Sequence, residues 1–440
     1  MSAATARERQ VAFRVLRRVD GGAYADRALR GEAGRAELDR RDWARARRLA
    51  YGVVQRRRTL DWVVDRCLDR TRELEPEVRD VLRLGAYELL FSDGAPDRAV
   101  VDQAVRLARG IRGSSARRSA RGGLVNAVLR RLAAEGRDIL ARLDAEGSAG
   151  LRYSLPDWIA DGLTSTLGEE APATMAAFNE PPETALRWNP LKGPRRDVEL
   201  IVPGAGRDPR LPEAYVAQPG FAFERSPLAT NGKALGQSRA SMIPARAVDP
   251  RPGERILDLC AAPGAKATHL AALAHGGARV TAVELHASRA AALERLAARM
   301  GARIDVVVGD GRTIALEGPF DAALVDPPCT GLGVLAGRPD ARWRRRPESL
   351  DPLVELQRAL LERALEAVRP GGRVVYSTCT LLPRENEDVV AAAGAPLDDL
   401  TDRFPGWGHP RVGGSIRTLP GRDATDGFFV ARLAVGRDPE

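Results

Sequence analysis

From about residue 251 onward, the chain alternates short apolar runs, tight loops and helical segments. This alternation constrains the fold more than any other feature, because successive βα units place their strands in parallel and cover the sheet with helices. The predicted strands are 255–260, 279–284, 304–308, 320–325 and 373–377, and helices are predicted from Lys266 through Leu273, up to about Met300, and from about 352 to 368. The run 428–433 is expected to be an edge strand. We therefore predict a doubly wound, Rossmann-like α/β domain over residues 237–440.

Residues 1–142 show a different pattern, with apolar side chains recurring every three and four positions, as in Val11, Val15 and Val19. Such stripes are typical of amphipathic helices in a bundle. This region contains 32 Arg against 20 Asp and Glu, a net charge of +12, whereas the remaining residues sum to −3. We predict an all-α domain over 1–142 that binds nucleic acid through its positive charge. A merely solvated basic helical surface is the alternative.

Two arginine-rich segments are candidates for phosphate contact. Residues 110–123 (GIRGSSARRSARGG) are expected to form a basic loop before a helix, where arginines and backbone amides converge. Residues 342–346 (RWRRR) offer a second contact, with Trp343 available to stack on a base. The alternatives are a flexible solvated loop and a loop anchored by one core tryptophan.

Residues 150–236 are proline-rich and mixed in pattern. Short β-like runs at 185–188, 198–202 and 215–217 alternate with breakers such as Pro181 and Pro182. A small α+β domain is predicted here, and its residues indicate no chemistry of their own.

The four cysteines, at positions 67, 260, 329 and 379, have no metal-ligand spacing, and no metal site is predicted. The N-terminus lacks the apolar segment of a signal peptide, and no apolar run reaches the length of about 18 residues that a membrane helix needs. The chain is therefore expected to be cytoplasmic, with no membrane partner and with reduced thiols available for chemistry.

The segment 257–270 (LDLCAAPGAKATHL) carries the first candidate site. A strand ends in a tight loop where Gly264 and its small neighbours let a ligand approach the backbone. The segment matches neither the dinucleotide fingerprint nor the phosphate-binding loop, which favours a ligand without a pyrophosphate. Glu284 closes the next strand, where an acid can bind ribose hydroxyls, and Asp310 follows the third, where a carboxylate can accept from an exocyclic amine. Together with Asp258 at the end of the first strand, these acids predict an adenosine-type cofactor.

Two cysteines arrive at neighbouring strand ends beside this loop. Asp326 and Cys329 lie in LVDPPCTGLG (324–333), and Cys379 lies in YSTCTLLPREN (376–386). Buried structural cysteines are the usual alternative, but strand ends in this fold face the ligand crevice. A catalytic thiol is therefore predicted.

The motifs DLCAAPGAK, VDPPCTG and YSTCTLLPREN closely resemble those of S-adenosylmethionine-dependent RNA cytosine-C5 methyltransferases. The resemblance is closest to the RsmB (Sun/Fmu) type, which acts on 16S ribosomal RNA and carries a helical domain similar to the antitermination factor NusB. The segment GLVNAVLRRL (123–132) resembles the last helix of that domain.

The resemblance implies residue roles by motif. Cys379 matches the nucleophile and Cys329 the second cysteine, which assists product release. The implied cofactor-binding residues are Cys260, Ala261, Ala262, Pro263, Gly264, Ala265, Lys266, Glu284, Asp310 and Asp326. Asp326 is also expected to hydrogen-bond cytosine N3. The family usually has glycine where this chain has Ala265, and often Ala where it has Pro327; only mild adjustment is expected.

The expected partner is RNA, either 16S ribosomal RNA or a small-subunit assembly intermediate, and the chain is expected to be a monomer. Four alternatives remain open at this point: a tRNA or other RNA substrate, an adenine amino-methyltransferase, a DNA cytosine methyltransferase, and a non-catalytic NusB-like regulator. The second would place an aromatic residue at position 329, and the third generally lacks the second cysteine. The paired cysteines and the complete cofactor loop argue against the fourth.

Overall fold

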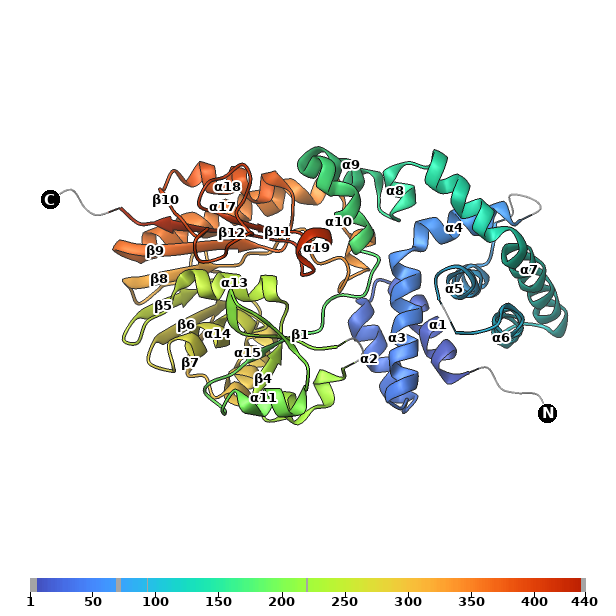
Figure 1. Cartoon of the computed structure of the whole chain (residues 1–440), viewed down its shortest axis with the longest axis horizontal. Coiled ribbons are helices and arrows are strands. Elements are labelled where there is room, and N and C mark those ends of the chain that lie inside the picture. The colour runs from blue at the N-terminus through green and yellow to red at the C-terminus, as the bar shows by residue number, and fades with distance from the viewer. Residues whose placement is uncertain (1–5, 69–72, 93, 219–220, 437–440) are drawn as a thin grey trace. The chain divides into compact units, whose positions relative to one another are not determined.

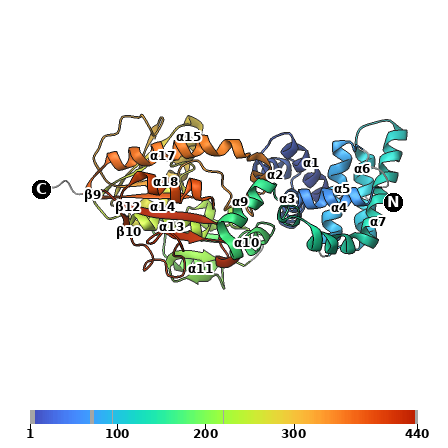
Figure 2. The same cartoon turned by 90° about the horizontal axis from the view of Figure 1, so that it is seen from above.

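The computed structural model describes residues 6–68, 73–92, 94–218 and 221–436. The chain divides into two compact units (Figure 1, Figure 2). The helical unit comprises Met1–Ser165, Met175–Glu180 and Leu335–Arg344, and the α/β unit comprises Thr166–Thr174, Pro181–Val334 and Arg345–Glu440. Within the described residues, no helix is both long enough and apolar enough to cross a membrane.

The helical unit is all-α, as predicted. Its main helices are α1 (Arg7–Asp20), α2 (Ala25–Arg35), α3 (Arg40–Gln55), α4 (Arg57–Arg66), α5 (Pro76–Phe91), α6 (Asp97–Gly110) and α7 (Ser115–Glu146). Their apolar stripes form one core that includes Val11, Leu60 and Leu129. Helices α5 and α7 approach closely because Gly85 has no side chain: a Cβ there would lie 2.5 Å from Cδ1 of Leu129.

The predicted basic loop 110–123 is mostly helix, and that prediction was wrong in its extent. Helix α7 begins at Ser115 because the side chain of Ser114 caps it, accepting a hydrogen bond from the Arg117 amide at 3.3 Å. Arg121 is buried and donates to Glu75 at 2.5 Å. Arg112 and Arg117 remain exposed, at the turn before α7 and in its first turn.

The RWRRR segment is only partly accessible: Arg342 and Trp343 are anchored by hydrogen bonds, whereas Arg344 and Arg346 are exposed. Arg342 is fully buried in the helical unit, and its guanidinium donates to the carbonyls of Gln55 and Phe178 at 2.8 and 2.9 Å. Burial lowers the pKa of Arg342 to about 9. The indole of Trp343 donates to the Val54 carbonyl at 2.7 Å. This hydrogen bond favours the anchored-loop alternative for Trp343, and stacking of its partly exposed ring on RNA stays a prediction.

The α/β unit contains a small antiparallel sheet in the order β2-β3-β1-β4. Its strands are β1 (Ala185–Trp188), β2 (Gly206–Asp208), β3 (Leu211–Val216) and β4 (Ala234–Gly236). The predicted strand 198–202 is instead part of helix α11 (Arg196–Ile201) and the residue after it. Val198 and Val202, four residues apart, are both buried against this sheet, which is the spacing of a helix face.

The large sheet has the order β10-β12-β9-β8-β5-β6-β7, with β11 paired to β12 (Figure 1). Its strands are β5 (Arg255–Asp258), β6 (Arg279–Glu284), β7 (Ile304–Val308), β8 (Phe320–Val325), β9 (Val368–Thr378), β10 (Leu397–Asp398), β11 (Ile416–Thr418) and β12 (Phe428–Ala434). Strands β5 to β9 pair in parallel, and β12 runs antiparallel to β9. Because β10 and β11 also pair with β12, this last strand is internal, and the expectation of an edge strand was wrong.

Helices cover both faces of the large sheet, as a doubly wound fold requires. Helices α13 (Arg239–Val248), α14 (Ala265–Leu273) and α15 (Ala287–Met300) contribute to one core. Helices α17 (Leu350–Ala367) and α18 (Glu387–Ala393) contribute to the other. The successive β5 residues Ile256 and Leu257 belong to the two different cores, because neighbouring side chains of a strand point to opposite faces of the sheet.

Six further helices complete the described structure outside the 3₁₀ turns and α11. They are α8 (Ala149–Arg152), α9 (Asp157–Leu167), α10 (Ala171–Ala177), α12 (Pro227–Thr230), α16 (Ala341–Arg344) and α19 (Pro420–Asp423). Strand β5 lies between β6, the next strand in sequence, and β8. The strand order therefore reverses at the carboxyl end of β5, where ligands bind in open α/β sheets.

Candidate active site

The loop after β5 forms a cradle at this point. Gly264 has φ of +102°, a conformation that favours glycine, and a Cβ there would lie 3.0 Å from the Leu293 side chain. Its amide donates to the Ala261 carbonyl at 2.8 Å, which closes the turn. Ala265 is the first residue of α14 and lies outside the positive-φ positions, so alanine is accommodated there without strain.

Asp258, at the end of β5, is a buried carboxyl group in this cradle. It is 1% exposed, and within the described part of the chain its oxygens make no hydrogen bond of ordinary geometry. Burial, and next the charge of Asp326, raise the pKa of Asp258 to about 7. A buried, unpartnered carboxyl beside a tight glycine turn fits a ligand that brings hydrogen-bond donors or positive charge.

This raised pKa predicts how stability depends on pH. Between about pH 4 and 7 the folded protein binds a proton at Asp258 that the unfolded chain has released, so this stabilisation is lost as pH rises through about 7. The unfolding free energy of ligand-free protein, relative to that of Asp258→Asn, should fall between pH 5 and 8 by an amount on the order of a few kcal/mol. Denaturant titrations of both proteins measure it. A constant difference across this range would contradict the assigned burial of charge.

The next two strands place the other predicted acids at the same edge. Glu284 ends β6, is 3% exposed, and accepts a hydrogen bond from the His286 amide at 3.0 Å. Asp310 follows β7, and Arg312 donates to both of its oxygens, which lowers the pKa of Asp310 to about 2. An exocyclic amine would therefore share Asp310 with this guanidinium.

Lys266 and Asp326 form an ion pair that joins α14 to the end of β8. The Lys266 ammonium lies 2.6 Å from Oδ2 of Asp326. The Ser377 hydroxyl donates to the other oxygen, Oδ1, at 2.9 Å. This fixes the Asp326 carboxyl between two donors.

The two predicted thiols are adjacent. The sulfur atoms of Cys329 and Cys379 lie 3.3 Å apart, although 50 residues separate them in sequence. Cys329 is buried, whereas Cys379 is partly exposed. The hydrogen bond to Cys379, burial, and the negative charges of Glu385 and Asp326 raise the pKa of Cys329 well above its usual range. The structure thus brings Cys329, Cys379 and the Lys266–Asp326 pair to the carboxyl ends of β8 and β9.

The other two cysteines have different surroundings. Burial, with the nearby Asp258 charge, raises the pKa of the Cys260 thiol strongly. Cys67 packs in the core of the helical unit. Among the residues that the structure describes, no group of three metal-ligating side chains occurs.

Side chains of the small sheet contact helix α14, which begins at the end of the cradle loop. Arg187 in β1 is fully buried and donates to the Ala265 carbonyl at 2.5 Å and to the Thr268 hydroxyl at 2.9 Å, both in α14. Glu213 in β3 lies 2.9 Å from Nε2 of His269, one residue further along the same helix. The sequence indicated no role for these residues, because no motif marks a buried arginine that binds carbonyls.

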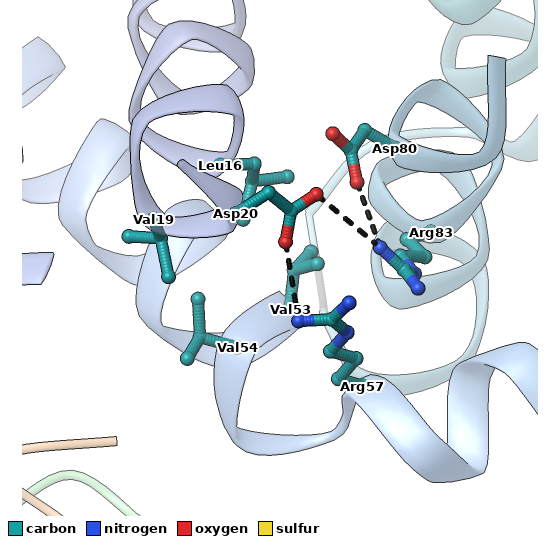
Figure 3. Close-up of a pocket in the computed structure, with 8 residues that line it drawn as sticks. All are labelled: Leu16, Val19, Asp20, Val53, Val54, Arg57, Asp80 and Arg83. Carbon is teal, nitrogen blue, oxygen red and sulfur yellow. Dashed lines mark hydrogen bonds and ion pairs between the residues drawn. The ribbon is translucent and has the colours of Figure 1, made fainter. Parts of the chain in front are cut away.

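A cavity in the helical unit offers no comparable chemistry. It is lined by an ionic cluster in which Asp20 approaches Arg57 at 3.1 Å and Asp80 approaches Arg83 at 2.8 Å (Figure 3). Its volume of about 10 Å³ has room for about one water molecule, which is too small for a substrate.

Comparison with known proteins agrees with this division. Residues 245–434 match the family described as 16S rRNA methyltransferase RsmB/F, and residues 6–134 match the NusB family. The fold, the cradle and its acids therefore define the class of the α/β unit: it is an S-adenosylmethionine-dependent methyltransferase.

Relatives span nearly the whole chain. The probable ribosomal RNA small subunit methyltransferase B of Synechocystis is 34% identical over 97% of this chain and 98% of its own length. The ribosomal RNA small subunit methyltransferase B of Thermus thermophilus is 37% identical over 97% of each chain. The crystal structure of PH0851 is similar over 99% of both chains, with a TM-score of 0.78 and 26% identity. The chain belongs to the RsmB/F family of rRNA cytosine methyltransferases, which confirms the resemblance seen in its motifs.

Proposed function

We propose that the protein methylates C5 of a cytidine in 16S ribosomal RNA through a covalent bond between Cys379 and cytosine C6. The observation that carries this proposal is the pair of sulfur atoms 3.3 Å apart beside the Lys266–Asp326 ion pair. The relatives named as small-subunit rRNA methyltransferases support the choice of RNA.

The surroundings of the two thiols favour Cys379 as the nucleophile. Cys379 is the more exposed of the two, and the Lys266 ammonium interacts electrostatically with it. Because the pKa of Cys329 is raised well above its usual range, we assign Cys329 as the donor of the hydrogen bond between the two sulfur atoms. This difference supports the ranking that the family resemblance implies, in which Cys379 is the nucleophile.

The proposed reaction begins when the Cys379 thiolate bonds to C6. The electron pair of the C5=C6 bond moves towards C4 and N3, and N3 takes up a proton from water, which it gives back to water when the aromatic ring is restored. We assign to Asp326, which the Lys266 ammonium holds in place, the hydrogen bond with N3. C5 has then become nucleophilic, like the carbon of an enamine. When bound, S-adenosylmethionine supplies the methyl group that C5 takes.

Release requires that C5 lose its proton to a base and that the S–C6 bond break. The bond's electron pair returns to the Cys379 sulfur as the C5=C6 double bond reforms. Cys329 lies 3.3 Å from that sulfur and is placed to give it a proton as it leaves; the proton returns to Cys329, which restores the Cys379 thiolate for the next attack. We therefore assign Cys329 to the release step.

Methyl transfer from labelled S-adenosylmethionine tests the proposal. Purified protein is incubated with 16S rRNA, tRNA, DNA of the same sequence, or no nucleic acid. Label in 16S rRNA that digests to 5-methylcytidine supports it. Transfer only to tRNA or DNA, or label in methylated adenosine, would favour one of the alternatives and end this proposal.

We propose further that exposed arginines of the helical unit provide RNA affinity. Replacing Arg112 and Arg117 together by alanine should weaken RNA binding and reduce the slope of log K against log salt by about 1 to 2, because each phosphate contact contributes about 0.7 to 0.9. Binding is measured by filter retention at several salt concentrations. Arg303→Ala with Arg358→Ala, at exposed positions of the α/β unit, is the matched control. Equal losses in both double variants would refute this placement of the affinity.

A further inference from the structure

Glu385 occupies an unusual position behind the two thiols. It ends the short 3₁₀ helix Pro383–Glu385, six residues after Cys379, and is fully buried. Its carboxyl oxygens accept from the Thr330 amide at 2.8 Å, from the Thr330 hydroxyl at 2.5 Å and from Nε2 of Gln357 at 3.0 Å. Thr330 directly follows Cys329, so this carboxyl group holds the peptide that carries one of the thiols.

The same network reaches the other thiol. The hydroxyls of Thr330 and Thr380 lie 2.7 Å apart, and Thr380 directly follows Cys379. Because Thr330 gives its single hydroxyl hydrogen to Glu385, Thr380 must be the donor of this bond. One carboxyl group therefore fixes the residue after each cysteine relative to the other.

Further bonds make this arrangement rigid. Nε2 of Gln357 also donates to the Pro328 carbonyl at 3.0 Å, so that both sides of Cys329 are held. The Tyr376 hydroxyl donates to the backbone carbonyl of Glu385 at 2.7 Å. In the described chain, neither arginine nor lysine forms a salt bridge with the Glu385 carboxyl; its partners there are neutral donors.

Burying a carboxylate among neutral donors costs folding free energy, because a charge removed from water is stabilised best by an opposite charge. Packing alone therefore does not explain a glutamate at this position. The negative charge of Glu385 is also one of the causes of the raised pKa of Cys329. Both observations connect this residue with the chemistry of Cys329.

We propose that Glu385 is a positioning residue that holds Cys329 against Cys379 and thereby permits release of the methylated RNA. The inference rests on the proposed covalent mechanism. Glu385 touches neither substrate nor cofactor in this account; it acts through Thr330. Its loss should therefore impair release more than attack.

The test compares Glu385→Ala with Glu385→Gln. Alanine leaves two buried donors of Thr330 without their acceptor, and turnover should fall about 10- to 100-fold. The enzyme–RNA adduct should then persist on a denaturing gel. Glutamine can keep the network if its amide donates to Thr330 Oγ1 and the Thr330 hydroxyl turns to Thr380. Glu385→Gln should therefore retain most turnover and show no persistent adduct. Glu366→Ala, at an exposed position of α17, is the matched control.

Thr330→Ala against Thr330→Ser gives a second comparison in case Glu385→Ala does not fold. The alanine variant should accumulate adduct and the serine variant should not. The inference is overturned if these variants, folded and able to bind cofactor, release product at the normal rate, lose methylation without adduct, or behave alike within each pair. Absence of adduct from Cys329→Ala as well would instead count against the proposed mechanism.

Discussion

Replacement of Cys379 by alanine is expected to abolish methyl transfer, with a loss of at least about 10⁴-fold in turnover. Cytosine C5 is a poor nucleophile until a thiolate adds at C6, and the remaining thiol, Cys329, is buried with a pKa well above its usual range. No covalent RNA adduct should form, because the attacking sulfur is gone. Methyl transfer and adduct are measured on the same samples.

Cofactor binding provides the control for this variant. The cradle consists of the end of β5, with Asp258, and the loop that follows it, with Gly264. Because Cys379 lies outside this segment, Cys379→Ala should bind S-adenosylmethionine with nearly normal affinity in calorimetry. Cys67→Ala, in the core of the helical unit, is a thiol control that should keep its activity. Substantial methylation by Cys379→Ala would eliminate Cys379 as the nucleophile.

Replacement of Cys329 by alanine is expected to reduce turnover about 10²- to 10⁴-fold, the usual contribution of a general acid or base. The cause differs from that in Cys379→Ala. Attack and methyl transfer still proceed, but the departing sulfur loses the proton donor that lies 3.3 Å away. Protein should therefore remain joined to RNA.

A denaturing gel distinguishes the two variants directly. A slowly migrating band that contains both protein and RNA should appear with Cys329→Ala, disappear on ribonuclease treatment, and be absent from Cys379→Ala. The double variant should also lack it. A band with Cys379→Ala but not with Cys329→Ala would exchange the two roles.

The sequence predicted the residues that carry the proposed chemistry, but not the buried residues that hold them in place. Motifs mark the strand ends, so the acid Glu284 and the thiols Cys329 and Cys379 could be placed at one edge of a parallel sheet from the sequence alone. The 3.3 Å separation of the thiols could not, because it depends on how the loops after β8 and β9 pack.

The buried residues that hold the site in place, Arg187 and Glu385, were missed because their hydrogen-bond partners are distant in sequence. Arg187 binds α14 from 78 residues away, and Glu385 binds Thr330 from 55 residues away. No periodic pattern reports such pairs. Arg342 was misinterpreted for the same reason. An arginine in a basic run is a candidate for RNA contact, but the five N–H donors of its guanidinium can also bind buried carbonyl groups, as they do here.

Errors in secondary structure have local causes. The apolar run 198–202 suits either a strand or one face of a helix, and burial of Val198 and Val202 on the same side decided for the helix. The segment 110–123 was predicted to be a basic loop that leads into a helix, but the Ser114 cap and an alanine-containing first turn start α7 within it.

The central claim is that this chain installs 5-methylcytidine in 16S ribosomal RNA through Cys379. Bisulfite sequencing of ribosomal RNA tests it most directly, in cells that lack the chain and are complemented with the wild-type protein or with Cys379→Ala. We expect a protected cytidine in 16S rRNA that depends on the wild-type protein and is absent from both the deletion and the Cys379→Ala cells. Protection that persists without the chain, or that Cys379→Ala restores, would contradict the account.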